Sequence, residues 1–205
     1  ADAEAIRLNL NCRKPVNVLL SPGGWGTGKT EYAGSRLSRV MQTTPHAICW
    51  ALHETVPSAV DQQHPLIYKY LPPNLKGEKA ILEKTTYVAY KEKTGFSDGS
   101  FVLHNHARCR FWTYEGGVDK LQGPTVRFAW GDELEPVDFL ASISGRVGRG
   151  NGTHLMTFAP IHGHTATVQE MCDGAEVCCE ITAFLNPADG GPKDVARYLG
   201  LGDEE

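Results

Sequence analysis

A glycine-rich stretch at residues 21–30, SPGGWGTGKT, constrains the fold of this chain more than any other segment. Residues 23–30 fit the pattern G-x-x-x-x-G-K-[ST]. The apolar run at 16–20 predicts a buried strand before it, and apolar residues at 33, 37, 40 and 41 predict a helix after it. A glycine loop in this context lets successive backbone N–H groups surround a phosphate, and the helix start adds its positive end. The sequence therefore predicts a nucleotide site of the Walker A type.

Each residue of this loop has an expected role. The residues expected to hold the nucleotide are Gly23, Gly24, Trp25, Gly26, Thr27, Gly28, Lys29 and Thr30. The ammonium of Lys29 would reach the outer phosphates, and the hydroxyl of Thr30 would bind Mg²⁺. Trp25 would cover the nucleotide, pack against a neighbouring subunit or pack locally.

A second acidic element is needed if the nucleotide is hydrolysed. The segment TVRFAWGDELEP at 125–136 is an apolar strand that ends in an acidic pair, as a Walker B element does. Asp132 would hold Mg²⁺, directly or through water, and Glu133 would activate the attacking water. Glu135 would be a further acid behind the metal site. The interpretation depends on the phosphate loop, because an Asp-Glu pair alone is more typical of a solvated strand end.

Strands and helices alternate along the chain. Strands are expected at 16–20, 46–52, 125–130, 153–159 and 176–185, with a hairpin of 101–105 and 109–114. Helices are expected at 29–41, 136–144 and 165–172. A further helix is expected from 58 to the residue before Pro65, within a segment that stops at Pro72-Pro73. This order predicts an α/β fold of the P-loop NTPase type, RecA/ASCE-like, with a mainly parallel central sheet flanked by helices.

Composition excludes several classes of protein. The formal net charge is −4, and no apolar run reaches the roughly 20 residues of a membrane span. The first residues lack a signal-peptide layout, so we expect a protein that is not secreted. The six cysteines form no CxxC pair, which favours free thiols. His104/His106 and His162/His164 lack further ligands at suitable spacing, and we expect hairpin and loop histidines rather than a zinc site.

The ordered set of motifs resembles the ATPase domain of the large terminase subunit, the DNA-packaging motor of tailed bacteriophages. The resemblance spans about residues 16–170. It rests on Tyr114-Glu115, Leu121-Gln122-Gly123, the acidic turn 132–136, and Thr157-Phe158-Ala159-Pro160 with Gly163. Two positions depart from the family, since Trp25 stands where the family often has an arginine and Ala159 where it often has a threonine.

The resemblance implies an ATP- and Mg²⁺-dependent motor that assembles as a homo-oligomeric ring around double-stranded DNA. It implies a portal protein and a small terminase subunit as partners, the host cytoplasm as location, and no membrane. Thr157–Pro160 would be the coupling motif that senses the γ-phosphate. Residues 1–185 would form the motor domain, and 186–205 a tail or the start of a linker to a C-terminal nuclease domain absent from this chain.

A cation that stabilises the transition state is not supplied by the phosphate loop itself. The candidates are Lys120, Arg146 and Arg149, acting from a neighbouring subunit. The arginines are favoured, because a planar fork fits phosphate oxygens and glycines at 145, 148 and 150 would let a turn project. DNA contact or simple solvation is the alternative for both. Two other functions stay open: a helicase-like ATPase, and a nucleotide-gated scaffold with little turnover.

Overall fold

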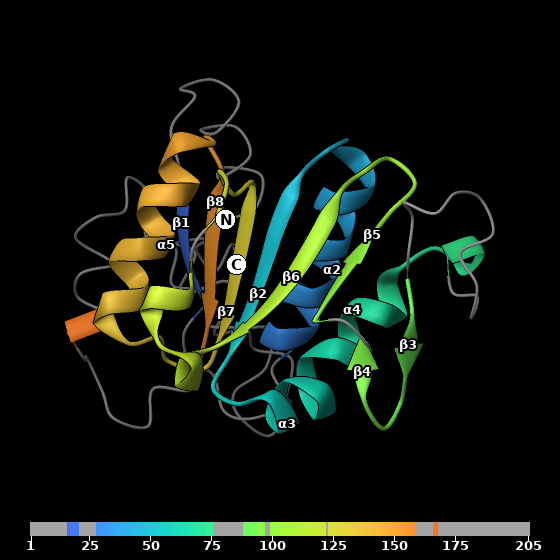
Figure 1. Cartoon of the computed structure of the whole chain (residues 1–205), viewed down its shortest axis with the longest axis horizontal. Coiled ribbons are helices and arrows are strands. Elements are labelled where there is room, and N and C mark those ends of the chain that lie inside the picture. Colours follow the sequence, from blue (N-terminus) through green and yellow to red (C-terminus); the bar gives the residue numbers. More distant parts are fainter. Residues whose placement is uncertain are drawn as a thin grey trace, which may run out of the picture.

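The computed structural model describes residues 16–20, 28–75, 88–96, 99–121, 123–158 and 166–167. Its centre is a six-stranded sheet in the order β1-β8-β7-β2-β6-β5. All neighbouring strands are parallel except the edge pair β5 and β6, which is antiparallel. Helices α2 and α4 lie on one side of the sheet and α5 on the other (Figure 1). This architecture confirms the predicted α/β class with a mainly parallel sheet flanked by helices.

The described elements follow in chain order. They are β1 (Val16–Leu20), α2 (Lys29–Thr43), β2 (Ile48–His53), α3 (Val56–Ser58), the π-helical turn η1 (Ala59–Gln63), α4 (His64–Tyr70), η2 (Pro73–Leu75), β3 (Tyr90–Lys91), β4 (Gly95–Phe96), β5 (Ser100–Val102), β6 (Arg108–Thr113), η3 (Tyr114–Gly116), η4 (Val118–Lys120), β7 (Phe128–Asp132), α5 (Val137–Arg149) and β8 (Thr153–Thr157). None of the described helices is long and apolar enough to cross a membrane.

Alternation along the central strands divides the core in two. On β7, Phe128 and Trp130 pack into the cluster that contains Leu37 of α2, whereas Ala129 packs with Phe139 of α5. Successive side chains of a strand point to opposite faces, so a strand covered on both faces is apolar throughout. This explains why the sequence of β7 shows a continuous apolar run.

Two helices run further than the sequence suggested. The helical path does not stop before Pro65, because η1 widens to a π-turn and Pro65 then occupies the first turn of α4, where its missing N–H is not needed. Helix α5 continues to Arg149 through the expected turn at 144–150. Ile143 and Val147 stay buried at helical spacing, and their burial outweighs the low helix propensity of the glycines.

The remaining predictions for the elements are confirmed or lie outside the described residues. The helix from Lys29, the hairpin, and the strands at β2, β7 and β8 are present, with ends shifted by up to three residues. Cys49 and Cys109 are free and buried. The helix expected at 165–172 is described only at 166–167, and the strand at 176–185, Cys12, Cys172, Cys178, Cys179 and the pair His162/His164 lie outside the described residues.

His64, the first residue of α4, is a buried titratable group. Its ring is 4% exposed and packs against Phe96 and Phe111, with ring centroids 5.4 and 4.0 Å away. The backbone N–H of Phe96 donates to Nδ1. Burial, with a smaller contribution from nearby His53, lowers the pKa of His64 to about 4. The folded protein therefore holds this imidazole neutral at pH values where an unfolded chain would protonate it.

We predict a loss of stability when this group is forced to charge. A depressed pKa contributes stability that is present above about pH 6.5 and lost as the pH falls toward 4. The shift corresponds to a loss of about 3 kcal/mol in the free energy of unfolding, measured by chemical denaturation at pH 7 and pH 4. His64→Asn, whose amide oxygen can replace Nδ1, should show a shallower pH dependence. His104→Asn on the exposed loop is the control, and a slope equal to that of the wild type in His64→Asn would contradict the prediction.

Candidate active site

The carboxyl ends of the parallel strands meet at one edge of the sheet. β7 ends at Asp132, β8 at Thr157 and β2 at His53. β1 leads through the phosphate loop to Gly28, which caps α2 in a left-handed conformation (φ 81°). Helix α2 contacts both β7 and β8. The fold therefore brings the start of α2 and the acidic turn together, as open α/β sheets do at their ligand sites.

Thr157 is the hydrogen-bonding centre of this edge. Its hydroxyl donates to Asp132 Oδ1 at 2.6 Å and accepts from Trp130 Nε1 at 2.8 Å. All three side chains are buried. Because a hydroxyl carries one proton, the donor capacity of Thr157 is already used by the carboxylate. A sensing role for Thr157, which the family resemblance suggests, would therefore act through Asp132.

Glu133 occupies an unusual backbone conformation. Its φ is 66°, a left-handed value that is uncommon for a residue other than glycine, and its N–H donates to the carbonyl of Thr157 at 2.8 Å. The side chain is exposed, in contrast to its neighbour Asp132. The turn thus sends one carboxylate into the protein and the next toward solvent. Strained backbone of this kind is concentrated at functional sites.

The three charged groups at this edge influence one another. Burial raises the pKa of Asp132 to about 6, against the hydrogen bond from Thr157. Burial also raises the pKa of Glu133, and Lys29 opposes that rise. Burial lowers the pKa of Lys29, and the charges of Glu133 and Asp132 oppose part of that shift. Lys29 and the two acids are therefore close enough to interact, at the place where the sequence predicted phosphate and metal.

Glu135 lies on the other face of the sheet. Its Oε1 is 2.9 Å from His154 Nε2 on β8, and both side chains are fully buried. A Cβ on Gly131 would lie 1.8 Å from the same carboxylate oxygen, so only glycine fits there. Asp132 and Glu135 therefore point to opposite faces. The carboxylate of Glu135, in the turn after β7, ties that turn to β8, and its role behind a metal site stays a prediction.

Sequence reasoning gave no site role to three residues, of which only Tyr114 appeared in a motif. His53 Nε2 lies 3.8 Å from Asp132 Oδ2, and its Nδ1 accepts from the N–H of Glu54, which leaves the proton on Nε2. Burial lowers the pKa of His53, so the ring is a neutral donor. Tyr114 donates to the carbonyl of Asp132 at 3.3 Å. The carboxylate of Glu54 is close enough to raise the pKa of Glu133. The signal for His53 was a polar residue at the end of a buried strand, the same signal that identified Asp132.

The structure corrects the expectation that the two candidate arginines lie in a projecting turn. They lie in the last turns of α5, just before the chain enters β8. This is the end of the sheet where the parallel strands begin, whereas Asp132 lies at the end where they finish. The guanidinium of Arg146 donates to the carbonyl and hydroxyl of Ser142 and lies 5.7 Å from the ring of Trp50. Arg149 is exposed, and its Nε donates to the carbonyl of Gly145. Neither residue projects from a turn, because the turn is helical.

The other predicted site residues are placed in part. Lys120 ends η4 and is exposed, in the segment that follows the carboxyl end of β6. Lys29 and Thr30 begin α2 beside the acidic turn. Gly23, Gly24, Trp25, Gly26 and Thr27 lie outside the described residues. Among the described residues, no group of three or more His, Cys, Asp or Glu side chains is arranged to hold a metal.

Comparisons with known proteins give structural similarity only. No protein-family model and no curated protein sequence matches the chain. The chain is similar to the solved large terminase ATPase domain of Thermus phage P74-26, with 16% identity and a TM-score of 0.49. It is also similar to an arginine-to-alanine mutant of that domain, with 14% identity and a TM-score of 0.49. The matches cover 70% and 73% of this chain but only 58% and 63% of those chains.

We predict that Thr157→Val weakens the fold and Thr157→Ser does not. Valine keeps the shape but leaves the indole N–H of Trp130 and the carboxyl of Asp132 without the hydroxyl that pairs them. Loss of a buried partner costs about 1–3 kcal/mol, measured as the free energy of unfolding by chemical denaturation. Serine retains the hydroxyl and serves as the matched control. Equal stabilities of the two variants would show that the hydroxyl does not link these groups.

Proposed function

We propose that this chain binds ATP with Mg²⁺ and hydrolyses it. The observation that carries the proposal is the placement of Lys29, at the start of α2, beside the Asp132-Glu133 turn. The glycine-rich loop precedes that helix in the sequence, so we expect its phosphate donors to lie near the cation and the two carboxylates at this end of the sheet. The two acids differ in environment, and such a pair divides metal binding from proton transfer.

The residues at this edge suit a magnesium ion. Mg²⁺ takes oxygen ligands, commonly one or two carboxylates with phosphates and waters. Oδ1 of Asp132 accepts from Thr157, Oδ2 lies 3.8 Å from Nε2 of His53, and Thr30 follows Lys29 at the start of α2. Burial raises the pKa of this carboxylate to about 6, and a nearby cation would stabilise its charged form. When bound, the ion would neutralise charge on the phosphate oxygens.

Glu133 is the group proposed to accept the proton of the attacking water. Its side chain is exposed at the mouth of the site, and the left-handed backbone with the bond to Thr157 fixes the direction in which it leaves the turn. A pKa raised by burial moves this carboxylate closer to the range suited to a base near neutral pH. Lys29 would hold the outer phosphates, and Thr157 would orient the carboxylate of Asp132.

We further propose that the hydrolysis drives double-stranded DNA into a viral capsid, as the motif resemblance implies. In this proposal residues 1–185 form the motor domain and 186–205 lead toward a nuclease domain. The chain would act in the host cytoplasm as a homo-oligomeric ring, with a portal protein and a small terminase subunit. A cation supplied between subunits would be the exposed Arg149 or Lys120; Arg146 is less suited, because its own helix and Trp50 hold it.

We predict that Glu133→Gln binds ATP but hydrolyses it at least ~10²-fold more slowly, the scale expected for the loss of a general base. Glutamine keeps the size of the side chain and loses only the basic carboxylate. Phosphate release with Mg²⁺ and ATP measures the rate, and nucleotide titration measures affinity. Glu115→Gln, on the exposed η3 turn, is the control. Turnover at the wild-type rate in Glu133→Gln would assign the base elsewhere, and absence of turnover in the wild type with tight ATP binding would favour the scaffold alternative.

Lys29→Ala should abolish tight ATP binding, because it removes the point charge that reaches the outer phosphates. Isothermal titration with a non-hydrolysable ATP analogue and Mg²⁺ measures the effect. Lys91→Ala, an exposed lysine on β3, is the control and should bind like the wild type. Unchanged affinity in Lys29→Ala would remove the phosphate-loop assignment and with it the proposed function.

A further inference from the structure

The last residue of β2 lies beside the acidic turn. β2 and β7 are parallel neighbours in the sheet, and Leu52 of β2 is paired with Gly131 of β7. His53 and Asp132 are the next residues, and each is the last residue of its strand. Nε2 of His53 lies 3.8 Å from Oδ2 of Asp132, and both side chains are buried. The register of the sheet thus places an imidazole next to the carboxylate that is proposed to hold Mg²⁺.

Both side chains point to the face of the sheet that α2 covers. Ala51 on β2 and Trp130 on β7 belong to the core cluster that also contains Leu37 of α2. Side chains two positions apart on a strand share a face, so the next residue on this face is His53 on β2 and Asp132 on β7. The helix on this side is the one that the glycine-rich loop precedes (Figure 1). The imidazole is therefore on the same side of the sheet as the proposed phosphate site.

The proton of the His53 ring is on the nitrogen that lies near Asp132. The N–H of Glu54 donates to Nδ1 at 2.8 Å, so Nδ1 is an acceptor and the neutral ring carries its proton on Nε2. Within the described structure this buried nitrogen makes no hydrogen bond. Burial lowers the pKa of His53, and the charge of Glu54 and the amide of the exposed Gln62 oppose part of that shift. An ionised carboxylate is a stronger acceptor than an amide, which favours Asp132 as the partner of this donor.

The two oxygens of Asp132 have different neighbours. The hydroxyl of Thr157 donates to Oδ1 at 2.6 Å, whereas Oδ2 lies near Nε2 of His53. A separation of 3.8 Å is longer than a hydrogen bond, but an N–H dipole at this distance still attracts a charged oxygen in a buried site. Burial raises the pKa of Asp132 to about 6, so neighbouring donors are needed to stabilise its charged form. Thr157 and His53 together would fix both oxygens of the carboxylate.

We propose that His53 is a positioning residue for Asp132, and that the N–H at its Nε2 orients Oδ2 and so presents the carboxylate to Mg²⁺. This inference rests on the proposed function, in which Asp132 holds the metal. His53 acts through Asp132 and contacts neither the metal nor the nucleotide. Loss of a group that orients a metal ligand typically weakens metal affinity ~10–100-fold. A histidine that only fills the core would change stability and leave the dependence of nucleotide binding on Mg²⁺ as it is.

Two substitutions separate the roles of the two ring nitrogens. In His53→Gln the amide nitrogen can replace Nε2 and keep a donor near Asp132. In His53→Asn the amide oxygen can replace Nδ1 and accept from Glu54, but no donor reaches Asp132. A non-hydrolysable ATP analogue is titrated calorimetrically into the 205-residue protein with Mg²⁺ and, separately, with EDTA.

His53→Asn should bind the analogue at least about tenfold more weakly in Mg²⁺ and with unchanged affinity in EDTA. His53→Gln should stay close to the wild type, as should His104→Asn on the exposed loop, which is the control. Equal losses in the two buffers would overturn the proposal, because they would indicate a structural role. Wild-type affinity in His53→Asn, or the same loss in His53→Gln, would also overturn it.

Two measurements without nucleotide decide the link between His53 and Asp132 independently of the proposed function. In the wild-type protein, long-range ¹⁵N–¹H NMR of the histidine rings should find the His53 proton on Nε2, and a proton on Nδ1 would overturn the proposal even if the variants fail to fold. A double-mutant cycle of His53→Asn and Asp132→Ala should show coupling of about fivefold or more in the unfolding equilibrium constant, whereas additive effects would overturn the link. A wild-type protein that shows this coupling but binds no ATP analogue would overturn the proposed function and, with it, the role toward Mg²⁺.

Discussion

The candidate active site depends on the attachment of one turn to one strand. β8 holds the acidic turn through three interactions: the hydroxyl of Thr157 on Asp132, the carbonyl of Thr157 on the N–H of Glu133, and the ring of His154 on Glu135. The three contacts approach the turn from both faces of the sheet. A turn held in this way can keep a left-handed glutamate without a glycine, because the surrounding structure fixes the backbone more strongly than its own preference.

The attachment of the acidic turn to β8 also brings three charged groups close together. The buried Asp132 carries a raised pKa, and the exposed Glu133 and the ammonium of Lys29 lie within its influence. Without a ligand the acids and the lysine balance one another only in part, since burial disfavours charge on all three. A cation and a polyanion that bind together would stabilise the charged forms of all three groups. This charge pattern supports the proposal that magnesium and a triphosphate bind together.

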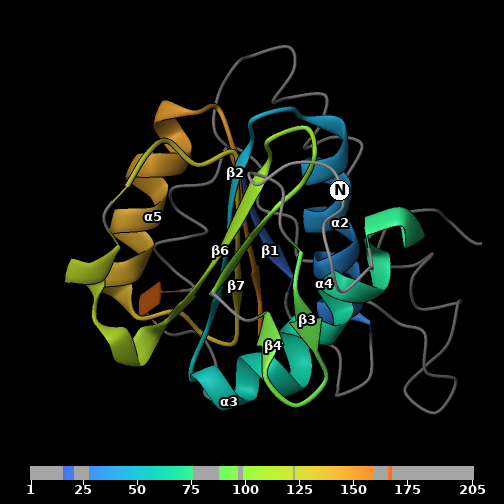
Figure 2. The same cartoon turned by 45° about the vertical axis from the view of Figure 1, so that its right-hand side comes forward.

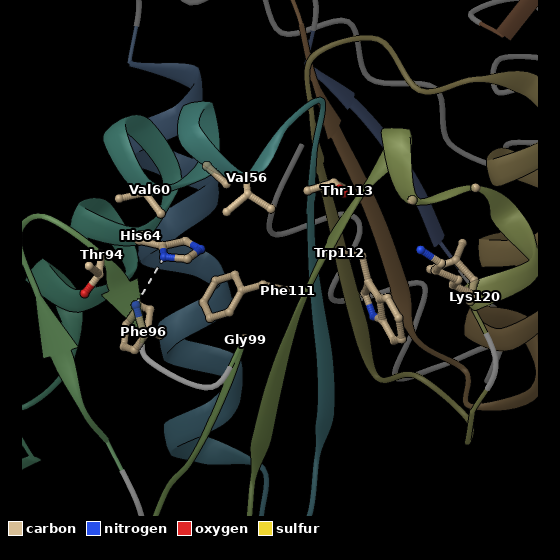
Figure 3. Close-up of a pocket in the computed structure, with 14 residues that line it drawn as sticks. Val56, Val60, His64, Thr94, Phe96, Gly99, Phe111, Trp112, Thr113 and Lys120 are labelled. Carbon is tan, nitrogen blue, oxygen red and sulfur yellow. Dashed lines mark hydrogen bonds between the residues drawn. The ribbon is translucent and has the colours of Figure 1, made fainter.

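The strands of the central sheet contribute differently to the proposed functional region. The strands β7 and β8 end in side chains that converge on one site, while β6 ends two strands away from β7 in the order of the sheet. Among the described residues, Nε2 of His64 and the indole N–H of Trp112 are buried without a hydrogen-bond partner. Figure 2 shows α5 on one side of the sheet and α2 with α4 on the other.

Local sequence determined the parts that depend on one element at a time: the helix from Lys29, the apolar strands, and the acidic pair after β7, because periodicity and strand ends are readable along the chain. It could not show that α5 continues through residues 144–149, since Ile143 and Val147 are buried in a cluster with residues distant in the chain, such as Trp50 and Ala129. Nor could it show that His53 faces Asp132 or that Glu135 turns to His154. Strand order and face decide those pairings, and both arise from contacts between residues far apart in the chain, which only the tertiary structure brings together.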